Sequence, residues 1–293
     1  MTLLKTRLAA AALLLGIGAA AHAFNLWEEI RKRVQGPAQT PTESGKPQPR
    51  WETGIEQAAR ALIGFSKEEE IAIGRQAAGN LLGAAALVND ARLQRYVNQV
   101  GRWIASQSKR PDLDWYFGVI ESNAINAFAA PGGYVLITRG LYRVLRNESE
   151  LAGVLAHEIA HIVEKHHLKI LEQTRLLERA GKVLTERAGE NEHIKNLIGN
   201  GAEIFSRALD KTAEYEADRL AMVLAARAGY DPFGLPMVLQ DLARVAGHDS
   251  RVSLLFKTHP HPDERLAQLE DTAERLDSVR GNTNRTRFYR LRP

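Results

Sequence analysis

The chain has 293 residues, 44% hydrophobic and 25% charged, which is ordinary globular composition and excludes a disordered or multi-span membrane chain. Its formal net charge of +4 is small, and the charged residues are scattered along the chain. This charge does not predict nucleic-acid binding, so we expect no nucleic-acid partner. There is no cysteine, which excludes disulfides, thiol nucleophiles and iron–sulfur clusters, so any metal must be held by His, Asp or Glu.

The first segment, residues 1–23, has the pattern of a secretory signal peptide. Lys5 and Arg7 precede an apolar run of about fourteen residues, shorter than the ~20 that span a bilayer. Ala21-His22-Ala23 is a small-x-small cleavage signal, which predicts cleavage after Ala23. We therefore expect an exported protein of the bacterial periplasm; the alternative is an uncleaved N-terminus that anchors the chain to the inner membrane.

Three further regions follow from composition. Residues 24–54 contain a proline-rich stretch and are predicted to form an N-terminal arm and linker. Residues 55–278 are predicted to form the folded domain. Residues 279–293 are a basic tail with five arginines, which we interpret as a solvated, frayed terminus; contact with anionic lipid or an acidic partner is the alternative.

The folded region is predicted to be mainly helical with a small β-sheet, an α+β fold. Ser66 and Glu69 form a capping box that begins a helix ending near Leu82. The apolar spacing predicts further helices over 90–106 and 262–276, and almost everything after Glu148 is predicted to be helical. Strands are predicted over 115–121 and 134–138, the second preceded by a turn at Pro131-Gly132-Gly133.

The strongest chemical signal is H-E-x-x-H at residues 157–161, within a helical pattern. An apolar stripe on this helix leaves His157 and His161 together on another side, one turn apart. Two imidazoles at this spacing can bind one zinc ion. Glu158 lies about 100° around the helix, where it can act as the general base toward water on the metal rather than as a ligand.

A third ligand must come from elsewhere in the chain. His167 is rejected because Glu164 stands where a chain-turning glycine would be needed, so the helix should continue; His166 and His167 are expected at its C-terminal dipole. Glu214 is preferred because a carboxylate completes an open catalytic zinc site.

The residues around Glu214 support this choice. Asp218 lies one turn later on the same face and can accept the free N–H of a ligand imidazole. Glu216 is the competing ligand and ranks lower, because it points about 160° away and has no acidic partner one turn on.

These motifs resemble the zinc metallopeptidase family that includes HtpX-like heat-shock proteases and CAAX prenyl proteases, and within it the soluble periplasmic branch. The resemblance covers roughly residues 66–272 and is carried by four motifs, at Asn126–Gly133, Glu150–His161, Ser206–Asp218 and Thr258–Arg265. It implies a zincin-like fold and one Zn²⁺ per chain on His157, His161 and Glu214, with Glu158 as base.

The resemblance also implies roles for two further groups. Residues 126–138 should form the strand that lines the substrate cleft, with contacts from Asn126, Ala127, Phe128, Gly132 and Gly133. His259 and Arg265 should lie near the metal as catalytic residues that stabilise the oxyanion; His259 could instead bind zinc in a closed resting state. The charged interval 168–205, where membrane-bound members carry apolar helices, is predicted to be a soluble helical arm.

The predicted function is therefore a zinc metalloendopeptidase of the bacterial cell envelope. It would hydrolyse peptide bonds in polypeptide substrates, such as misfolded envelope proteins, with a zinc-activated water and Glu158 as general base. Peripheral contact with the membrane or with envelope assembly proteins is also expected. The alternative is a chaperone-like periplasmic binding protein in which proteolysis is slow or conditional.

Overall fold

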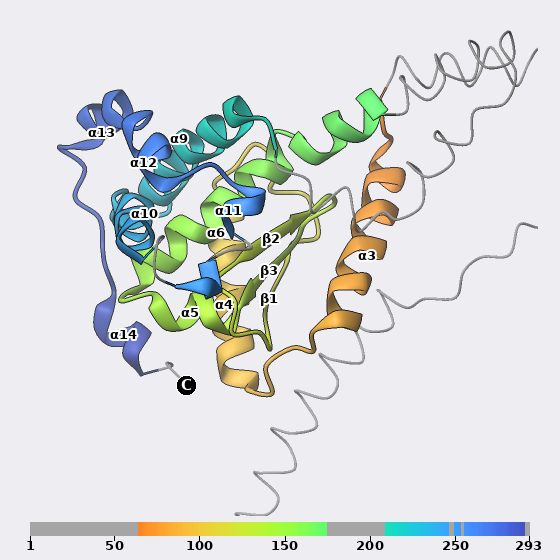
Figure 1. Ribbon diagram of the computed structural model, residues 1–293, viewed down its shortest axis with the longest axis horizontal. Helices are drawn as coiled ribbons and strands as arrows, with labels where there is room; N and C mark the ends of the chain where they lie inside the picture. The colour runs from red at the N-terminus through yellow and green to blue at the C-terminus, as the bar shows by residue number, and fades with distance from the viewer. Residues whose placement is uncertain (1–63, 175–208, 246–248, 253–254, 291–293) are drawn as a thin grey trace, which may run out of the picture. The chain divides into compact units, whose positions relative to one another are not determined.

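The computed structural model describes residues 64–174, 209–245, 249–252 and 255–290 (Figure 1). Every described residue belongs to one compact unit of the chain. The predicted signal peptide and N-terminal arm, and most of the predicted arm at 168–205, lie outside the described residues.

A three-stranded sheet carries one side of the site. Its strands are β1 (Tyr116–Ile120), β2 (Ala127–Ala130) and β3 (Tyr134–Thr138), in the order β1-β3-β2. Strand β1 pairs parallel with β3, and β2 pairs antiparallel with it. Both predicted strands are confirmed to within a residue. The prediction of one cleft strand over 126–138 is wrong, because this stretch is a hairpin whose second strand is central and whose first is at the edge.

The hairpin reverses direction at two positions whose backbone conformation favours glycine. Gly132 and Gly133 have φ of +75° and +99°, a region that residues with a Cβ rarely adopt. A Cβ on Gly132 would lie 2.8 Å from the Cα of Ile71, and one on Gly133 would lie 2.6 Å from the carbonyl oxygen of Asp114. The predicted turn is therefore confirmed, and it ends β2 where β3 begins.

Helices cover both faces of the sheet (Figure 1). Helix α3 (Lys67–Ala84) begins with the predicted capping box and packs on the Tyr134 face, where Gly74 allows close contact with the hairpin. Helix α4 (Ala91–Ala105) lies on the other face, where Gly101 accommodates the ring of Phe117. Because both faces are covered, all five residues of β3 are buried.

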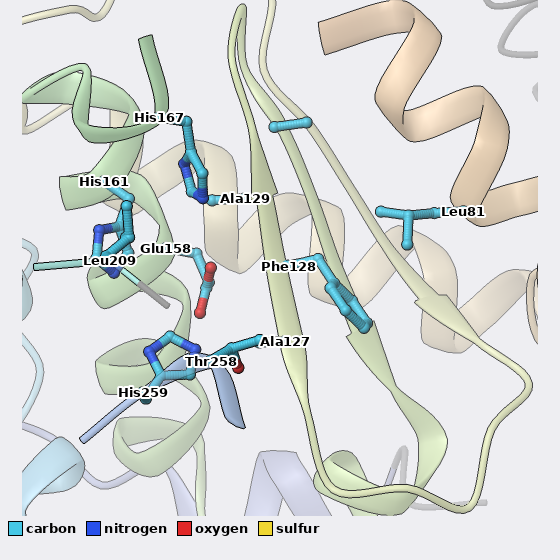
Figure 2. A pocket seen from close by; sticks show the side chains of 11 residues that line it. Leu81, Ala127, Phe128, Ala129, Glu158, His161, His167, Leu209, Thr258 and His259 are labelled. Carbon is cyan, nitrogen blue, oxygen red and sulfur yellow. The ribbon is translucent and has the colours of Figure 1, made fainter. Parts of the chain in front are cut away.

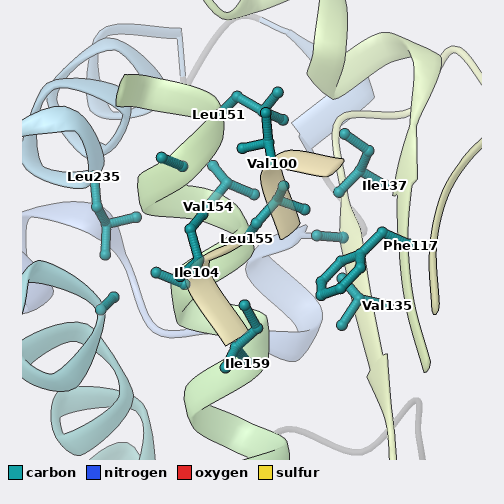
Figure 3. Close-up of a cluster of buried hydrophobic side chains, with 14 of the residues drawn as sticks. Val100, Ile104, Phe117, Val135, Ile137, Leu151, Val154, Leu155, Ile159 and Leu235 are labelled. Carbon is teal, nitrogen blue, oxygen red and sulfur yellow. The ribbon is translucent and has the colours of Figure 1, made fainter. Parts of the chain in front are cut away.

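The motif helix, α6 (Glu148–Val163), runs through the middle of the core. We expected one apolar stripe, but all sixteen of its residues are buried, since the helix packs against α4, the sheet, α9 (Lys211–Arg227) and α10 (Gly234–Val245). Leu151, Leu155 and Ile159 form its contacts with α4 and the sheet (Figure 3). Buried polar groups on such a helix need partners.

Helix α6 ends sooner than predicted. We expected the helix to continue through Glu164, but α6 ends at Val163 and Glu164 is its C-cap. Lys165 then adopts a φ of +56°, and a new helix begins at residue 166. The chain thus turns without the glycine that we took to be necessary, and this change in direction brings His166 and His167 back beside α6.

The C-terminal part also departs from the prediction. The helix expected over 262–276 is two helices, α12 (Pro262–Ala267) and α13 (Glu270–Leu276). The tail is not frayed as far as residue 290, because α14 (Arg285–Tyr289) buries Phe288 completely against Tyr142. The remaining elements are α5 (Arg139–Val144), a 3₁₀ turn at Ser250–Val252 and α11 (Leu255–Thr258).

The predicted fold class is confirmed: the described residues are mainly helical, with one small sheet. Within these ranges, no helix combines the length and apolar character needed to cross a bilayer.

Candidate active site

Two packed helices bring the predicted ligands together. His157 and His161 project from α6 and Glu214 from the first turn of α9, and His259 approaches from the end of α11; ligand atoms of all four lie within 4.8 Å of one another. The two imidazole Nε2 atoms are 3.0 Å apart. The carboxylate oxygens of Glu214 lie 3.6 Å from Nε2 of His157 and 3.5 Å from Nε2 of His161.

This donor set fits a divalent metal. Ligands about 2.0–2.1 Å from a tetrahedral zinc ion are roughly 3.3 Å apart, close to the separations observed. Oε1 of Glu214 is buried and accepts no hydrogen bond from any residue that the structure describes. A buried, unsatisfied carboxylate oxygen that faces two imidazole nitrogens is costly unless a cation is shared among them.

His157 is held by a buried ion pair. Its Nδ1 lies 2.8 Å from Oδ1 of Asp218, so the N–H is on Nδ1 and the lone pair of Nε2 faces the other ligands. Arg265 donates from Nε and Nη2 to the two oxygens of Asp218, at 2.8 and 2.6 Å. Burial raises the pKa of Asp218, but Arg265 and His157 outweigh it and hold that pKa well below its usual range.

His161 is oriented by a second chain of contacts. Its Nδ1 lies 2.9 Å from Nδ1 of His166, whose Nε2 lies 3.4 Å from Oε2 of Glu216. If Nε2 of His166 donates to Glu216, Nδ1 of His166 accepts from His161, and Nε2 of His161 keeps its lone pair for a metal. Glu216, which the sequence offered as a competing ligand, thus lies at the far end of this series of contacts, with a half-exposed side chain.

Glu158 faces a pocket beside the edge strand. We call it the strand pocket; it is lined by Leu81, Ala127, Phe128, Ala129, Ala130, Glu158, His161, His167, Leu209, Thr258 and His259. Figure 2 shows the histidine rings and Glu158 on one side of this pocket and β2 on the other. Burial raises the pKa of Glu158 above its ordinary value.

His259 contacts Glu214 directly, with Nδ1 2.7 Å from Oε2. Burial alone would raise the pKa of Glu214, but the charges on His259, His157 and Arg265 outweigh it and lower the pKa to about 2. The pKa of His259 is raised, because the attraction of Glu214 exceeds the effect of burial. The structure therefore places His259 at the ligand cluster, as the resemblance implied, and its two suggested roles stay predictions.

His167 is a site residue that the sequence reasoning missed. It was assigned to a helix dipole, but it lines the strand pocket with its ring centroid 5.9 Å from that of His161. Burial lowers the pKa of His167 to about 4, so it is uncharged at neutral pH and is not a cation at a helix end. The turn at Lys165 creates this placement, and its sequence has no glycine to signal it.

The predicted substrate-contacting residues do not all face the strand pocket. Ala127 and Phe128 line it, together with Ala129 and Ala130 of the same strand. Asn126 is fully buried, and Gly132 and Gly133 form the turn against α3, so these three are absent from its lining. Within the described ranges, the outer edge of β2 pairs with no other strand.

A buried helix that carries H-E-x-x-H and meets a carboxylate from a second helix defines a metallopeptidase-type site. The model of peptidase family M48 matches residues 91–273, which include the proposed ligands and Glu158, and the chain belongs to this family. The family resemblance seen in the sequence is thereby confirmed.

Several curated relatives of this chain are named as proteases or metalloendopeptidases. The beta-barrel assembly-enhancing protease of Escherichia coli (strain K12) is 32% identical over 216 residues, which cover 71% of this chain and 44% of the relative. That of Yersinia pestis is 31% identical, over 72% and 45%. The mitochondrial metalloendopeptidase OMA1 of Schizosaccharomyces pombe is 29% identical, over 60% and 52%. The chain spans about half the length of these relatives.

Proposed function

We propose that the chain is a zinc-dependent metalloendopeptidase that cleaves polypeptides of the bacterial cell envelope. The observation that carries this proposal is the cluster of His157, His161 and Glu214 around an unsatisfied buried carboxylate oxygen, with Glu158 on the adjoining pocket. Family membership and the names of the relatives support the same activity.

In this proposal His157, His161 and Glu214 hold the metal. When bound, zinc lowers the pKa of water toward about 7 and polarises the substrate carbonyl. Glu158 takes a proton from the attacking water as the new C–O bond forms, and it passes that proton to the amine as the C–N bond breaks. Asp218 and Arg265 keep the ring of His157 in place, and His166 does the same for His161.

The substrate would lie along β2. An extended peptide can pair with the free backbone groups of an edge strand, which needs no particular side chains and suits varied polypeptides. The small side chains of Ala127, Ala129 and Ala130 leave room for such a chain beside Glu158. We assign the substrate backbone to this strand.

The site of action in the cell is also part of the proposal. The signal-peptide pattern of residues 1–23 favours export to the periplasm. The relatives named for the enhancement of β-barrel assembly favour envelope assembly proteins as substrates or partners.

The test is the Glu158→Gln variant. Because the amide cannot accept the proton but leaves the three ligands unchanged, we expect zinc content to stay at one per chain and cleavage of casein to fall by several orders of magnitude. Asp263→Asn, which removes an exposed carboxylate of α12, is the matched control and should keep full turnover. Wild-type turnover by Glu158→Gln contradicts the proposal, and capture of unfolded protein by a wild-type, zinc-loaded chain that cleaves no casein would favour a binding protein.

A further inference from the structure

A second pocket adjoins Glu158. It shares Ala127, Glu158 and His259 with the strand pocket, so the two pockets meet at the proposed general base. We call it the aliphatic pocket, because most of its lining is aliphatic. These residues are Val154 of α6, four residues of α10, namely Leu235, Val238, Leu239 and Leu242, and also Leu141 and Leu255. It encloses about 370 Å³, including the part open to solvent.

Among the described residues, the only polar side chains that the aliphatic pocket offers to a ligand belong to the proposed catalytic site. Its four polar lining residues are His157, Glu158, His259 and Arg265, all at the proposed catalytic site. The charge of Arg265 is already neutralised, because both oxygens of Asp218 accept from it. A charged or amide side chain in this pocket would lose water without gaining a partner, whereas an apolar one would gain burial.

The position of the aliphatic pocket determines which part of a bound peptide can enter it. Ala127 is the first residue of β2, so a peptide paired with this strand passes from the strand pocket over Glu158 to the aliphatic pocket. Successive side chains of an extended peptide point to opposite sides. One side chain next to the reacting bond would therefore point toward Val154 and Leu235. Figure 3 shows these two side chains on α6 and α10.

We infer that the aliphatic pocket binds a bulky apolar side chain of the residue next to the scissile bond, and so selects the cleavage site. This inference rests on the proposed peptidase function and specifies its substrates. A pocket of this kind discriminates by about tenfold or more for each methylene group that the substrate lacks. Substrates with Leu, Met or Phe at this position are therefore cleaved at least tenfold better than those with Ala, Ser or Asp.

The first experiment maps cleavage sites. The zinc-loaded full chain digests a randomised peptide mixture, and mass spectrometry identifies the residues on both sides of each cut. We expect Leu, Met or Phe at one fixed position. Val238→Phe fills the pocket and should shift that preference toward Ala and Ser by at least tenfold; Leu242→Ala enlarges it and should shift the preference toward Phe and Trp.

The control adds the same volume outside the pocket. Val245→Phe is on the same helix, but Val245 does not line the aliphatic pocket, so the wild-type preference should remain. The preference is a ratio of cleavage products within one digest. A variant that folds less completely therefore gives the same ratio. Cleavage without an apolar preference, or a preference that neither pocket variant moves, overturns the inference and leaves the peptidase function standing.

The second experiment needs no turnover. In a Glu158→Gln background, fluorescence anisotropy measures binding of nine-residue Ser/Ala peptides with a central Leu, Phe or Asp. We expect the Leu and Phe peptides to bind at least tenfold tighter than the Asp peptide, and Val238→Phe to remove this difference. Such binding, together with no cleavage of any peptide by the wild-type zinc-loaded chain, supports the pocket and overturns the peptidase function. Equal binding of all the peptides, together with no cleavage by the wild-type chain, overturns both.

Discussion

Nδ1 of His157 lies 2.8 Å from Oδ1 of Asp218, across the contact between α6 and α9. This bond fixes which nitrogen of His157 carries the proton and points the other one at Glu214. Asp218→Asn keeps the shape but lets the ring take either tautomer. We expect zinc affinity to fall about 10–100-fold, as is usual when the partner of a ligand imidazole is lost.

Competition with a zinc chelator measures this change. Asp263→Asn is the matched control, since its carboxylate is exposed on α12 and contacts no proposed ligand. Equal zinc affinity for Asp218→Asn and the wild type would mean that His157 does not bind metal through Nε2.

Arg265 is expected to act through Asp218. Both of its bonds to that carboxylate are buried, so Arg265→Gln leaves a buried charge with one partner fewer. Loss of one member of a buried pair costs about 3–5 kcal/mol, and urea unfolding of the zinc-free chain should show this loss of stability. If stability is unchanged while turnover falls at constant zinc affinity, Arg265 contacts the reacting groups instead, as the resemblance suggested.

The packing of α3 against the hairpin can be tested with two glycines of one helix. A Cβ on Gly74 would lie 1.6 Å from the carbonyl oxygen of Pro131, so Gly74→Ala must displace the turn that ends β2. We expect a loss of about 1–3 kcal/mol in the free energy of unfolding and weaker peptide binding. Gly83→Ala meets no atom within 4 Å and should stabilise the chain by about 0.5–1 kcal/mol. Two equally small effects would show that α3 does not support β2.

The C-terminal helix is expected to stabilise the N-terminal end of α6. Phe288 is fully buried. Arg287 forms an ion pair with the buried carboxylate of Glu148, and Asn284 donates a hydrogen bond to it. The same carboxylate accepts hydrogen bonds from Tyr96 and Tyr230. Phe288→Ala should cost about 3–5 kcal/mol in denaturant unfolding. Tyr289→Ala, next to it and 40% exposed, should cost less than about 0.5 kcal/mol. A frayed terminus predicts no effect from either substitution.

Local patterns explain which parts of this molecule could be predicted. The capping box at Ser66 and the spacing of His157 and His161 depend on residues within one or two helical turns, so the sequence displays them directly. Glu214 lies beside His157 and His161, where it was predicted to be. That prediction rested on an acidic pair at helical spacing together with a family motif. The bonds of Asp218 to His157 and Arg265 join three separate helices, and only the first of them was anticipated.

The errors have a different origin. Burial of Phe288, the edge position of β2 and the return of His167 to the site all depend on contacts between distant segments or on one backbone angle. Lys165 shows the difficulty most clearly. A non-glycine residue adopts the left-handed conformation here, so a rule that required glycine gave the wrong path after α6.

The proposed function depends most on a metal shared by α6 and α9, and anomalous diffraction at the zinc edge from crystals of the zinc-loaded chain measures this directly. We predict one strong peak per chain, about 2.0–2.1 Å from Nε2 of His157, Nε2 of His161 and a carboxylate oxygen of Glu214. A map with no peak at these side chains, or with its only peak at other residues, would contradict the proposed zinc site.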